Sequence, residues 1–328
     1  MRLGWGKRRS SIMSILFLLG SFVVSGQSTA QGWPRTFHNA DGSVTAIPKK
    51  PERILSTAVS VTGTLLAIDA PVAASATAVN GQFLGQWRSV AKEKKVATLW
   101  PAGSVDLEQA WAAAPDLIVV SINGADSARA QLADLQAIAP VIIVNYGNQT
   151  WQELARQLGE ALGLEKEATA RIAGFNALIS RTRKKLHLPT GKANIIHFNG
   201  PGTVNPVAMP ESVHARLLRS LGFDIEAPNP AWQSNLTRSD DFIWVEYENL
   251  TQLKAETTFL LSAGDRRVSD FLNDPLLQRL PSARNRQVYS LGLHTFRVDY
   301  FSACEMVQEI ARHFAVDKPS SDMAQEAG

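Results

Sequence analysis

The stretch EKEATARIAGFNALISRTRKK, residues 165–185, decides the fold that we expect for this chain. Its apolar residues recur at helical spacing, and it contains no proline and a single glycine. Acidic residues stand at its start and basic residues at its end, which is the order that the helix dipole favours. Pro189 and Gly191 then end the predicted helix. At about 1.5 Å per residue, this helix is roughly 30 Å long.

Strand and helix patterns alternate on both sides of this helix, which predicts an α/β protein with parallel sheets. The alternation leaves two interpretations open, because the helix could join two α/β lobes or be an ordinary crossover helix inside one domain. Residues 80–95 are expected to be irregular and residues 200–210 to form a loop. The expected strands are 53–59, 71–76, 116–121, 141–146, 194–199, 223–225, 257–262 and 288–291, and the other expected helices are 62–68, 106–114, 125–138, 151–162, 211–221 and 300–314.

Residues 1–30 have the pattern of a secretory signal peptide. The basic residues Lys7, Arg8 and Arg9 precede an apolar run of 13 residues at 12–24, and small residues follow. The run is short for a membrane-spanning helix, so we expect export without a membrane anchor. Residues 317–328 are expected to be a disordered tail.

The charge balance argues against nucleic acid as a partner. The whole chain has 33 basic and 30 acidic residues, but four of the basic ones lie in residues 1–30. Removing that segment leaves 29 basic against 30 acidic residues, so the mature chain is close to neutral. The only cysteine, Cys304, cannot form an internal disulfide, so stability must come from a hydrophobic core.

The sequence favours a binding protein over an enzyme. It has no G-x-S-x-G, H-E-x-x-H, P-loop or dinucleotide-binding motif, and its six histidines lack metal-ligand spacing. One segment, TFRVDYF at residues 295–301, follows a predicted strand at the end where α/β sheets bind ligands. There Arg297, with Phe296 and Tyr300, suits an anionic aromatic ligand. The alternative for Arg297 is a salt bridge with Asp299 or a packing role.

Two glutamates form a second candidate site. Glu108 and Glu211 each stand at a predicted helix N-terminus, one in each half of the chain. The helix dipole alone favours acids there. The functional interpretation is that each half offers one exposed carboxylate to a basic site on a partner.

Eight stretches resemble one known family and together span nearly all of residues 33–315. The chain resembles the periplasmic substrate-binding proteins of ABC importers for ferric siderophores and cobalamin and, more narrowly, the branch that binds ferric enterobactin. The matching stretches are residues 53–57, 61–72, 86–87, 90–93, 115–118, 157–160, 273–277 and 295–300.

The resemblance implies two parallel-sheet α/β lobes, at residues 31–150 and 188–316, joined by helices at 151–187 that include one long rigid helix. It implies a periplasmic monomer that captures a ferric catecholate siderophore and delivers it to an inner-membrane ABC permease dimer. No catalysis and no cofactor of its own are expected, because the iron arrives chelated by the siderophore.

The resemblance also assigns residues. Glu108 and Glu211 match the family's two docking glutamates, and Arg297 and Arg238 match arginines that contact the ligand. A ferric tris-catecholate is a trianion with aromatic walls, which arginine and aromatic side chains can bind without touching the iron.

The chain departs from the enterobactin branch at two points. The loop at residues 79–86 is shorter and lacks an arginine, and residues 204–208 lack a tryptophan. Phe83, Trp87 and Arg88 are candidates to replace these side chains, while packing and surface roles are the alternative for Trp87 and Arg88.

Two rival functions remain at this stage. The first is a carrier for a ferric hydroxamate, cobalamin or haem, and haem would want an iron ligand such as Tyr146, Tyr300 or His294. The second is an exported hydrolase of the siderophore ester, which would need a nucleophile and a base. Ser56 and Ser121 lie near strand ends, but neither has an evident base nearby.

Overall fold

The computed structural model describes residues 1, 32–147, 149–234 and 241–315. The predicted signal peptide, the predicted tail and Arg238 lie outside the described residues. In chain order the elements are β1 (Arg35–His38), β2 (Val44–Ile47), β3 (Ile54–Ser56), α1 (Val59–Ala67), β4 (Val72–Thr77), α2 (Arg88–Glu93), β5 (Ala97–Pro101), α3 (Leu107–Ala112), β6 (Leu117–Ser121), η1 (Arg129–Gln131), α4 (Leu132–Gln136), β7 (Val141–Val144), α5 (Trp151–Leu162), α6 (Glu165–Arg183), β8 (Lys192–Ile196), β9 (Asn205–Ala208), α7 (Val213–Leu221), β10 (Asp224–Ile225), η2 (Pro230–Trp232), β11 (Phe242–Val245), η3 (Tyr247–Gln252), β12 (Thr257–Leu260), α8 (Asp265–Asn273), η4 (Leu277–Arg279), α9 (Pro281–Arg284), β13 (Val288–Ser290) and α10 (Tyr300–Phe314).

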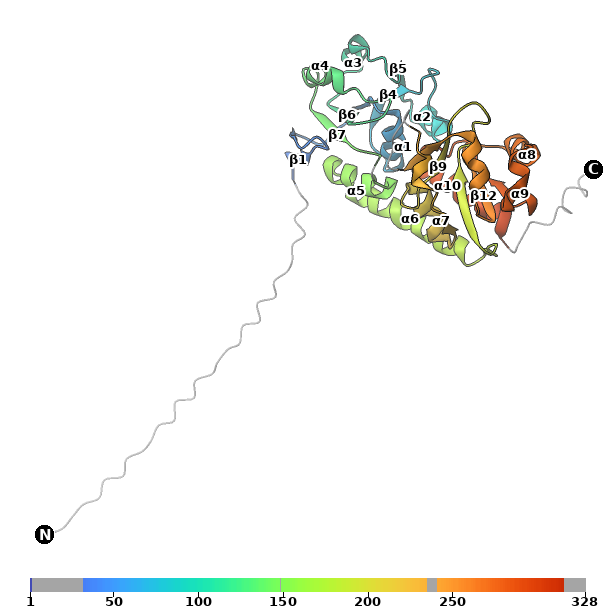
Figure 1. Ribbon diagram of the computed structural model, residues 1–328. Helices are drawn as coiled ribbons and strands as arrows, with labels where there is room; N and C mark the ends of the chain where they lie inside the picture. The colour runs from blue at the N-terminus through green and yellow to red at the C-terminus, as the bar shows by residue number, and fades with distance from the viewer. Residues whose placement is uncertain (2–31, 148, 235–240, 316–328) are drawn as a thin grey trace, which may run out of the picture. The chain divides into compact units, whose positions relative to one another are not determined.

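The first sheet is entirely parallel, with the strand order β5-β4-β3-β6-β7. Its central strands are apolar on both faces, as expected for a sheet with helices on either side. On β6, Leu117 and Val119 join a core that contains side chains of α1 and α5. Ile118 and Val120 join another core, with side chains of α3 and α4. A short β1–β2 hairpin precedes this sheet (Figure 1).

The second sheet is mixed, with the strand order β11-β9-β8-β12-β13. Strands β8, β10, β12 and β13 are parallel to one another, whereas β9 pairs antiparallel with both β8 and β11. The α/β class is therefore confirmed, but the prediction of a loop at 200–210 was wrong at β9. Pro206 is a loop signal in the sequence. In the fold its carbonyl accepts a 2.8 Å hydrogen bond from the His197 backbone, so this short segment can still join the sheet.

The two sheets are connected by a pair of helices, α5 and α6, that lie side by side (Figure 1). Gly163 ends α5 with φ at +69°, a left-handed conformation that glycine adopts without strain. A Cβ on Gly159 would come 2.9 Å from the Cβ of Ala168, so glycine permits the close approach of the two helices. The predicted helix at 165–185 is confirmed as α6, two residues shorter. Its role as a rigid connection stays a prediction.

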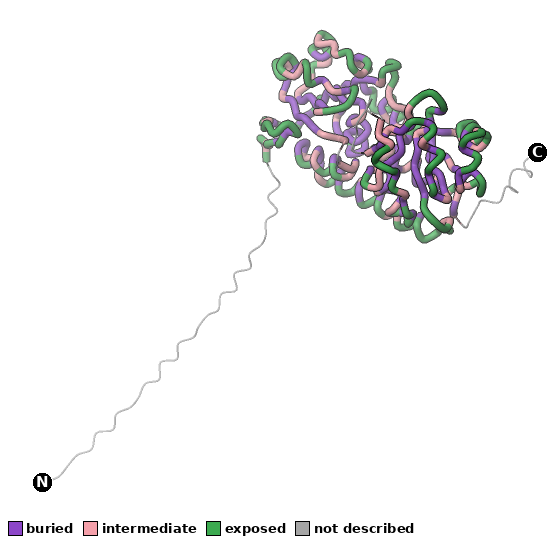
Figure 2. Tube along the Cα trace, viewed as in Figure 1, coloured by how far each residue is buried: buried purple, intermediate pink, exposed green. Residues whose placement is uncertain are grey.

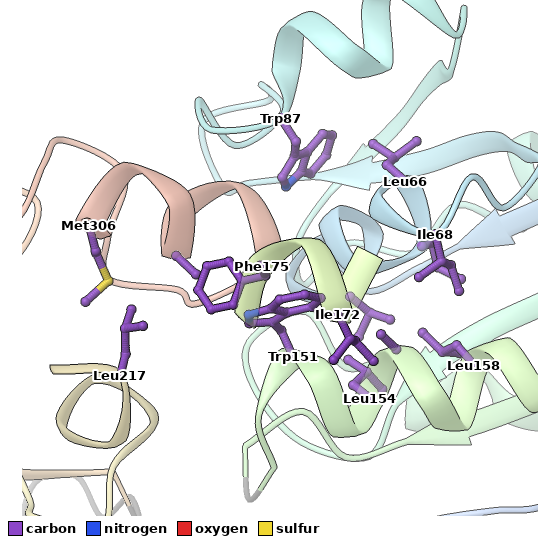
Figure 3. Packing of buried hydrophobic residues seen from close by; sticks show 14 of the residues in the cluster. Leu66, Ile68, Trp87, Trp151, Leu154, Leu158, Ile172, Phe175, Leu217 and Met306 are labelled. Carbon is purple, nitrogen blue, oxygen red and sulfur yellow. The ribbon is translucent and has the colours of Figure 1, made fainter. Parts of the chain in front are cut away.

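The two sheets share one hydrophobic core as well as this connection. Leu117 of β6 and Ile195 of β8 belong to the same cluster, together with side chains of α1, α5, α6, α7 and α10. Figure 2 shows the buried strands inside a largely exposed outer layer, and Figure 3 shows Trp151 and Phe175 within this shared core. The described residues between 33 and 315 form one compact unit. The lobe boundaries therefore stay a prediction, and we refer below to an N-terminal half (33–147) and a C-terminal half (192–315).

The prediction of one helix at residues 125–138 was wrong, and tertiary contacts explain the difference. Only η1 and α4 form there. Asp126 instead accepts a 2.9 Å hydrogen bond from the Ser60 backbone, and Ser127 donates one of 2.7 Å to the Ser121 carbonyl. Residues 80–95 were expected to be irregular but contain α2, and β1, β2, β5, α8 and α9 were also not predicted. None of the helices in the described ranges is long and apolar enough to cross a membrane.

Candidate functional site

Arg297 lies between aromatic rings that come from both halves of the protein. It is exposed and stands in the loop between β13 and α10. Its guanidinium carbon lies 5.4 Å from the ring centroid of Phe296 and 5.6 Å from that of Tyr146, which follows β7 in the N-terminal half. Within the described part of the chain, the Arg297 guanidinium makes no hydrogen bond or ion pair. Its N–H groups are therefore available to an anionic ligand.

Arg297, itself exposed, lines a small pocket of about 50 Å³, and we call it the Arg297 pocket. It lies where β7 ends and where the loop after β13 meets α1, α5 and α7, which is the sheet end at which α/β folds bind ligands. Its lining residues are Ser60, Thr64, Tyr146, Gly147, Gln149, Thr150, Trp151, Leu154, Val213, His214, Asp241, Phe242, Phe296, Arg297 and Val298.

A hydrogen-bond chain fixes the ring of Tyr146 beneath Arg297. The Tyr146 hydroxyl donates to Asp126 Oδ1 at 3.0 Å, and Asp126 Oδ2 accepts from the Ser60 backbone at the start of α1. Burial and the neighbouring Asp126 carboxylate raise the pKa of Tyr146, so its phenol stays protonated at neutral pH. The ring is thus a fixed neutral surface for the cation.

The other aromatic wall comes from the C-terminal half. Phe296 stacks on Phe242, with ring centroids 5.4 Å apart and an interplanar angle of 13°. His197 meets Phe296 edge-on at 4.8 Å. The wall and the guanidinium together offer aromatic faces and a positive charge to one ligand.

Two buried groups hold the loop that carries Arg297. Burial lowers the pKa of His214 to about 4, so this side chain is neutral, and its Nε2 lies 2.8 Å from the Thr295 carbonyl. On the other side, Asp299 caps α10 by accepting hydrogen bonds from the backbone of Phe301 and Ser302, at 2.9 and 3.0 Å. The loop is therefore anchored on both sides of Arg297.

Tyr300 does not line the Arg297 pocket, although the sequence placed it with Phe296 and Arg297. Its ring packs against Trp151, with centroids 5.3 Å apart, and the Arg171 guanidinium lies over it at 5.0 Å. The structure therefore gives Tyr300 a packing role between α10 and α6. This placement disfavours contact between Tyr300 and a ligand. That contact stays a prediction.

Phe83, Trp87 and Arg88 form a separate cluster at the start of α2, outside the lining of the Arg297 pocket. The Trp87 side chain is fully buried, at 0% exposure, and its ring lies 5.1 Å from that of Phe83. The Arg88 guanidinium donates to the Phe83 carbonyl at 2.9 and 3.2 Å. Trp87 is therefore in a packing position, which was the alternative to ligand contact. Ligand contacts of the half-buried Phe83 and the exposed Arg88 stay predictions.

The docking candidates Glu108 and Glu211 are both exposed, one in each half. Glu108 lies in the first turn of α3, where Asp106 already supplies the cap. Glu211 precedes α7, with its side chain 84% exposed and 3.4 Å from Arg219. Neither carboxylate is needed to cap its helix.

The three iron-ligand candidates of the haem alternative have different neighbours. Tyr146 bonds to Asp126, Tyr300 packs on Trp151, and His294 Nδ1 lies 3.4 Å from a Glu305 carboxylate oxygen. Over the described ranges, no group of three or more His, Cys, Asp or Glu side chains is placed to hold a metal ion.

Residues 54–293, which run from β3 to just beyond β13, match the family model described as periplasmic binding protein. The chain belongs to the periplasmic binding protein family. It is 39% identical over 311 residues to the ferric enterobactin-binding periplasmic protein FepB of Escherichia coli O6:H1, an alignment that covers 90% of this chain and 96% of FepB. The family resemblance seen in the sequence is thereby confirmed.

Solved structures share the fold. The structure of holo-ViuP is 55% identical, with a TM-score of 0.84, and the match covers 87% of this chain and 96% of ViuP. The catecholate-siderophore binding protein VctP of Vibrio cholerae is 16% identical, with a TM-score of 0.62 over 85% of this chain and 99% of VctP. At that identity, the VctP match supports the fold alone.

Sequence reasoning did not place Tyr146, Phe242 or His214 beside Arg297, although Tyr146 was named as a possible haem ligand. Tyr146 follows a strand of the first sheet, so the strand-end rule that selected Arg297 could also have selected it. Phe242 begins the antiparallel strand β11, which the sequence did not predict. His214 carried no signal, since a histidine on a helix usually packs.

Proposed function

We propose that this periplasmic binding protein captures a ferric catecholate siderophore beside the Arg297 pocket, against the exposed Arg297, and delivers it to an inner-membrane ABC permease. The observation that carries the proposal is the guanidinium of Arg297, held between the Phe296 and Tyr146 rings with no partner among the described residues. A ferric tris-catecholate presents negative charge and flat aromatic edges, which match such a group. The iron needs no protein ligand, because the siderophore occupies its coordination positions.

The similarities support the siderophore class without fixing the compound. FepB is named for ferric enterobactin, yet this chain has a higher identity to ViuP, 55% against 39%. The short loop before α2 and the absence of a tryptophan near β9 also separate it from the enterobactin branch. We therefore propose a catecholate whose identity must be found by titration.

The test is quenching of tryptophan fluorescence in purified residues 31–328. The ligands are ferric enterobactin, a linear ferric catecholate, a ferric hydroxamate and haemin. Submicromolar quenching by one or both catecholates, with weak quenching by the other two, is the expected result. Quenching by haemin or the hydroxamate alone would overturn the catecholate proposal.

We further propose that Glu108 and Glu211 dock the loaded protein onto arginines of the permease dimer. Both acids are exposed at helix starts, so a partner can reach them. Trp111, one turn after Glu108 on α3, is 58% exposed and could add apolar contact next to that carboxylate.

The docking test compares three charge reversals. Glu108→Arg and Glu211→Arg should leave the siderophore dissociation constant unchanged and abolish siderophore-dependent uptake in cells. Glu167→Arg is the matched control, because Glu167 is an exposed acid in the first turn of α6. Normal uptake with either docking variant, or equal loss with the control, would refute the docking role.

We also propose that the chain acts in the periplasm as a monomer and leaves its ligand chemically unchanged. Family membership supports the binding role. Mass spectrometry of the siderophore after overnight incubation tests it, since an intact ester is expected and hydrolysis products would show an enzyme.

A further inference from the structure

A second cavity adjoins the Arg297 pocket, and we call it the Arg216 cavity. Its volume is about 410 Å³, and helices α5, α6, α7 and α10 enclose it. Thr150, Trp151, Val213 and Val298 line both spaces. This volume falls within the range of small-molecule sites.

Two buried nitrogen atoms of residues that line this cavity have no hydrogen-bond partner among the described residues, and both are donors. The Trp151 side chain is 3% exposed, and its Nε1 has no hydrogen-bond partner among the described residues. Figure 3 shows that nitrogen at the end of the indole ring nearest Leu217, which also lines the cavity. The buried Nε of Arg216 likewise has no partner in the described part of the chain. Two unsatisfied buried donors around one space point to an acceptor from outside the chain.

Positive charge and apolar surface complete the site. Arg183 and Arg216 both line the cavity; within the described ranges Arg183 forms no ion pair, and Arg216 forms one long ion pair. The carboxylate nearest to Arg216 belongs to Glu153, at 3.9 Å, and it already accepts from the Thr150 backbone and hydroxyl at 2.6 and 2.8 Å. The rest of the wall includes Phe175 and Leu217, both largely buried.

We propose that the Arg216 cavity binds a small organic anion with an apolar body, its carboxylate accepting from Trp151 and the arginines. The indole N–H and the guanidinium of Arg216 supply directed donors, and Arg183 adds charge at the rim. The rings of Trp151 and Phe175 favour an aromatic body over an aliphatic one. This site adjoins the Arg297 pocket, and its proposal does not rest on the siderophore proposal.

The test follows the indole N–H resonance of Trp151 in a ¹⁵N–¹H spectrum of the purified protein, assigned by its loss in Trp151→Phe. The probes are 1-naphthoate, decanoate and the neutral control 1-naphthylmethanol. A saturable downfield shift with naphthoate, and little change with the alcohol, is expected. Decanoate binding more tightly than naphthoate would keep the anion site and overturn the aromatic preference. No shift with either acid, or an equal shift with the alcohol, would overturn the proposal.

Variants locate the binding by calorimetry. Trp151→Phe and Arg216→Gln should each weaken naphthoate binding by about tenfold, the loss expected for one hydrogen bond to a charged group. Arg297→Ala should leave naphthoate affinity unchanged. Melting temperatures check that each variant is folded. Unchanged naphthoate affinity in folded Trp151→Phe and Arg216→Gln would place the acid elsewhere and overturn the assignment.

Discussion

Two arginine–tyrosine pairs lie in the region where the halves of this protein meet. They differ in whether the arginine also forms hydrogen bonds and ion pairs. Arg171 lies 5.0 Å from the Tyr300 ring, and Arg297 lies 5.6 Å from the Tyr146 ring. Arg171 also donates to the Ala67 carbonyl at 2.6 Å and lies 3.6 Å from the Asp69 carboxylate. Arg297 has no such partner among the described residues. An arginine over an aromatic ring is thus structural when its N–H groups are bonded and available for a ligand when they are not.

The largest expected effect comes from removing Arg297. Arg297→Ala should weaken ferric-siderophore binding by about 1–3 kcal/mol, the range for a lost charge-assisted contact. That free energy corresponds to roughly 5- to 150-fold in the dissociation constant. Arg297→Lys should retain part of the affinity, because it keeps the charge and loses the planar fork. Fluorescence titration measures both, and wild-type affinity in Arg297→Ala would remove this residue from the site.

Removing Arg171 should have the opposite outcome. Arg171→Ala breaks the hydrogen bond from α6 to the end of α1 and the contact with Tyr300, so we expect a loss of about 1–2 kcal/mol in the free energy of unfolding. The siderophore dissociation constant should stay within about twofold, an energy of less than roughly 0.5 kcal/mol. Urea unfolding and titration of the same sample test this. A large loss of affinity at unchanged stability would break the comparison.

The buried Asp299 and His214 on either side of Arg297 should give opposing pH dependences of stability. Burial raises the pKa of Asp299 from 3.8 to about 6. The contribution of Asp299 to the free energy of unfolding therefore falls as pH rises from about 4 to 6. Burial lowers the pKa of His214 from 6.5 to about 4. The contribution of His214 to the free energy of unfolding therefore rises as pH increases from about 4 to 6.5. The two slopes should largely cancel in the wild type.

Single variants should expose each slope. Asp299→Asn should become more stable between pH 4 and 6.5 as pH rises, while His214→Gln should become less stable over the same range. Urea unfolding at several pH values measures the difference. Parallel curves for the wild type and both variants would show that neither group titrates in this window.

The smallest effect is expected from Tyr146→Phe. The ring under Arg297 remains, and Asp126 keeps its 2.9 Å hydrogen bond from Ser60. Stability should fall by about 1 kcal/mol for the lost hydroxyl hydrogen bond. Siderophore affinity should change little, as titration can check. A loss of affinity as large as that of Arg297→Ala would mean that the hydroxyl itself contacts the ligand.

The sequence predicted those parts of the fold whose signals are local. Helix α5 has its capping box at Thr150 and Glu153, and α10 has its cap at Asp299, so both helices were predicted with the bounds that the structure has. Strand β9 was missed, because its pairing with β8 and β11 is long-range and Pro206 signals a loop. The segment after β6 was predicted as a helix because the bond between Asp126 and Ser60 is a tertiary contact, invisible in the sequence.

The same limit applies to the site. Arg297 and Phe296 could be proposed from the sequence because their place after a strand and their chemistry are local properties. Tyr300 and Trp87 have the same chemistry, but only the three-dimensional contacts show that both are in packed positions. Aromatic and arginine residues near a strand end therefore indicate where a ligand site lies. Which of these side chains can contact a ligand depends on their burial and on the hydrogen bonds that they already make.

The most direct test of the central claim is the position of iron in crystals of the mature chain grown with a ferric catecholate, read from anomalous scattering at the iron edge. We predict one iron site beside the Arg297 pocket, with Arg297 in contact with catecholate oxygens and no protein atom bonded to the metal. Iron bound away from that pocket, or coordinated directly by a protein side chain, would contradict the account.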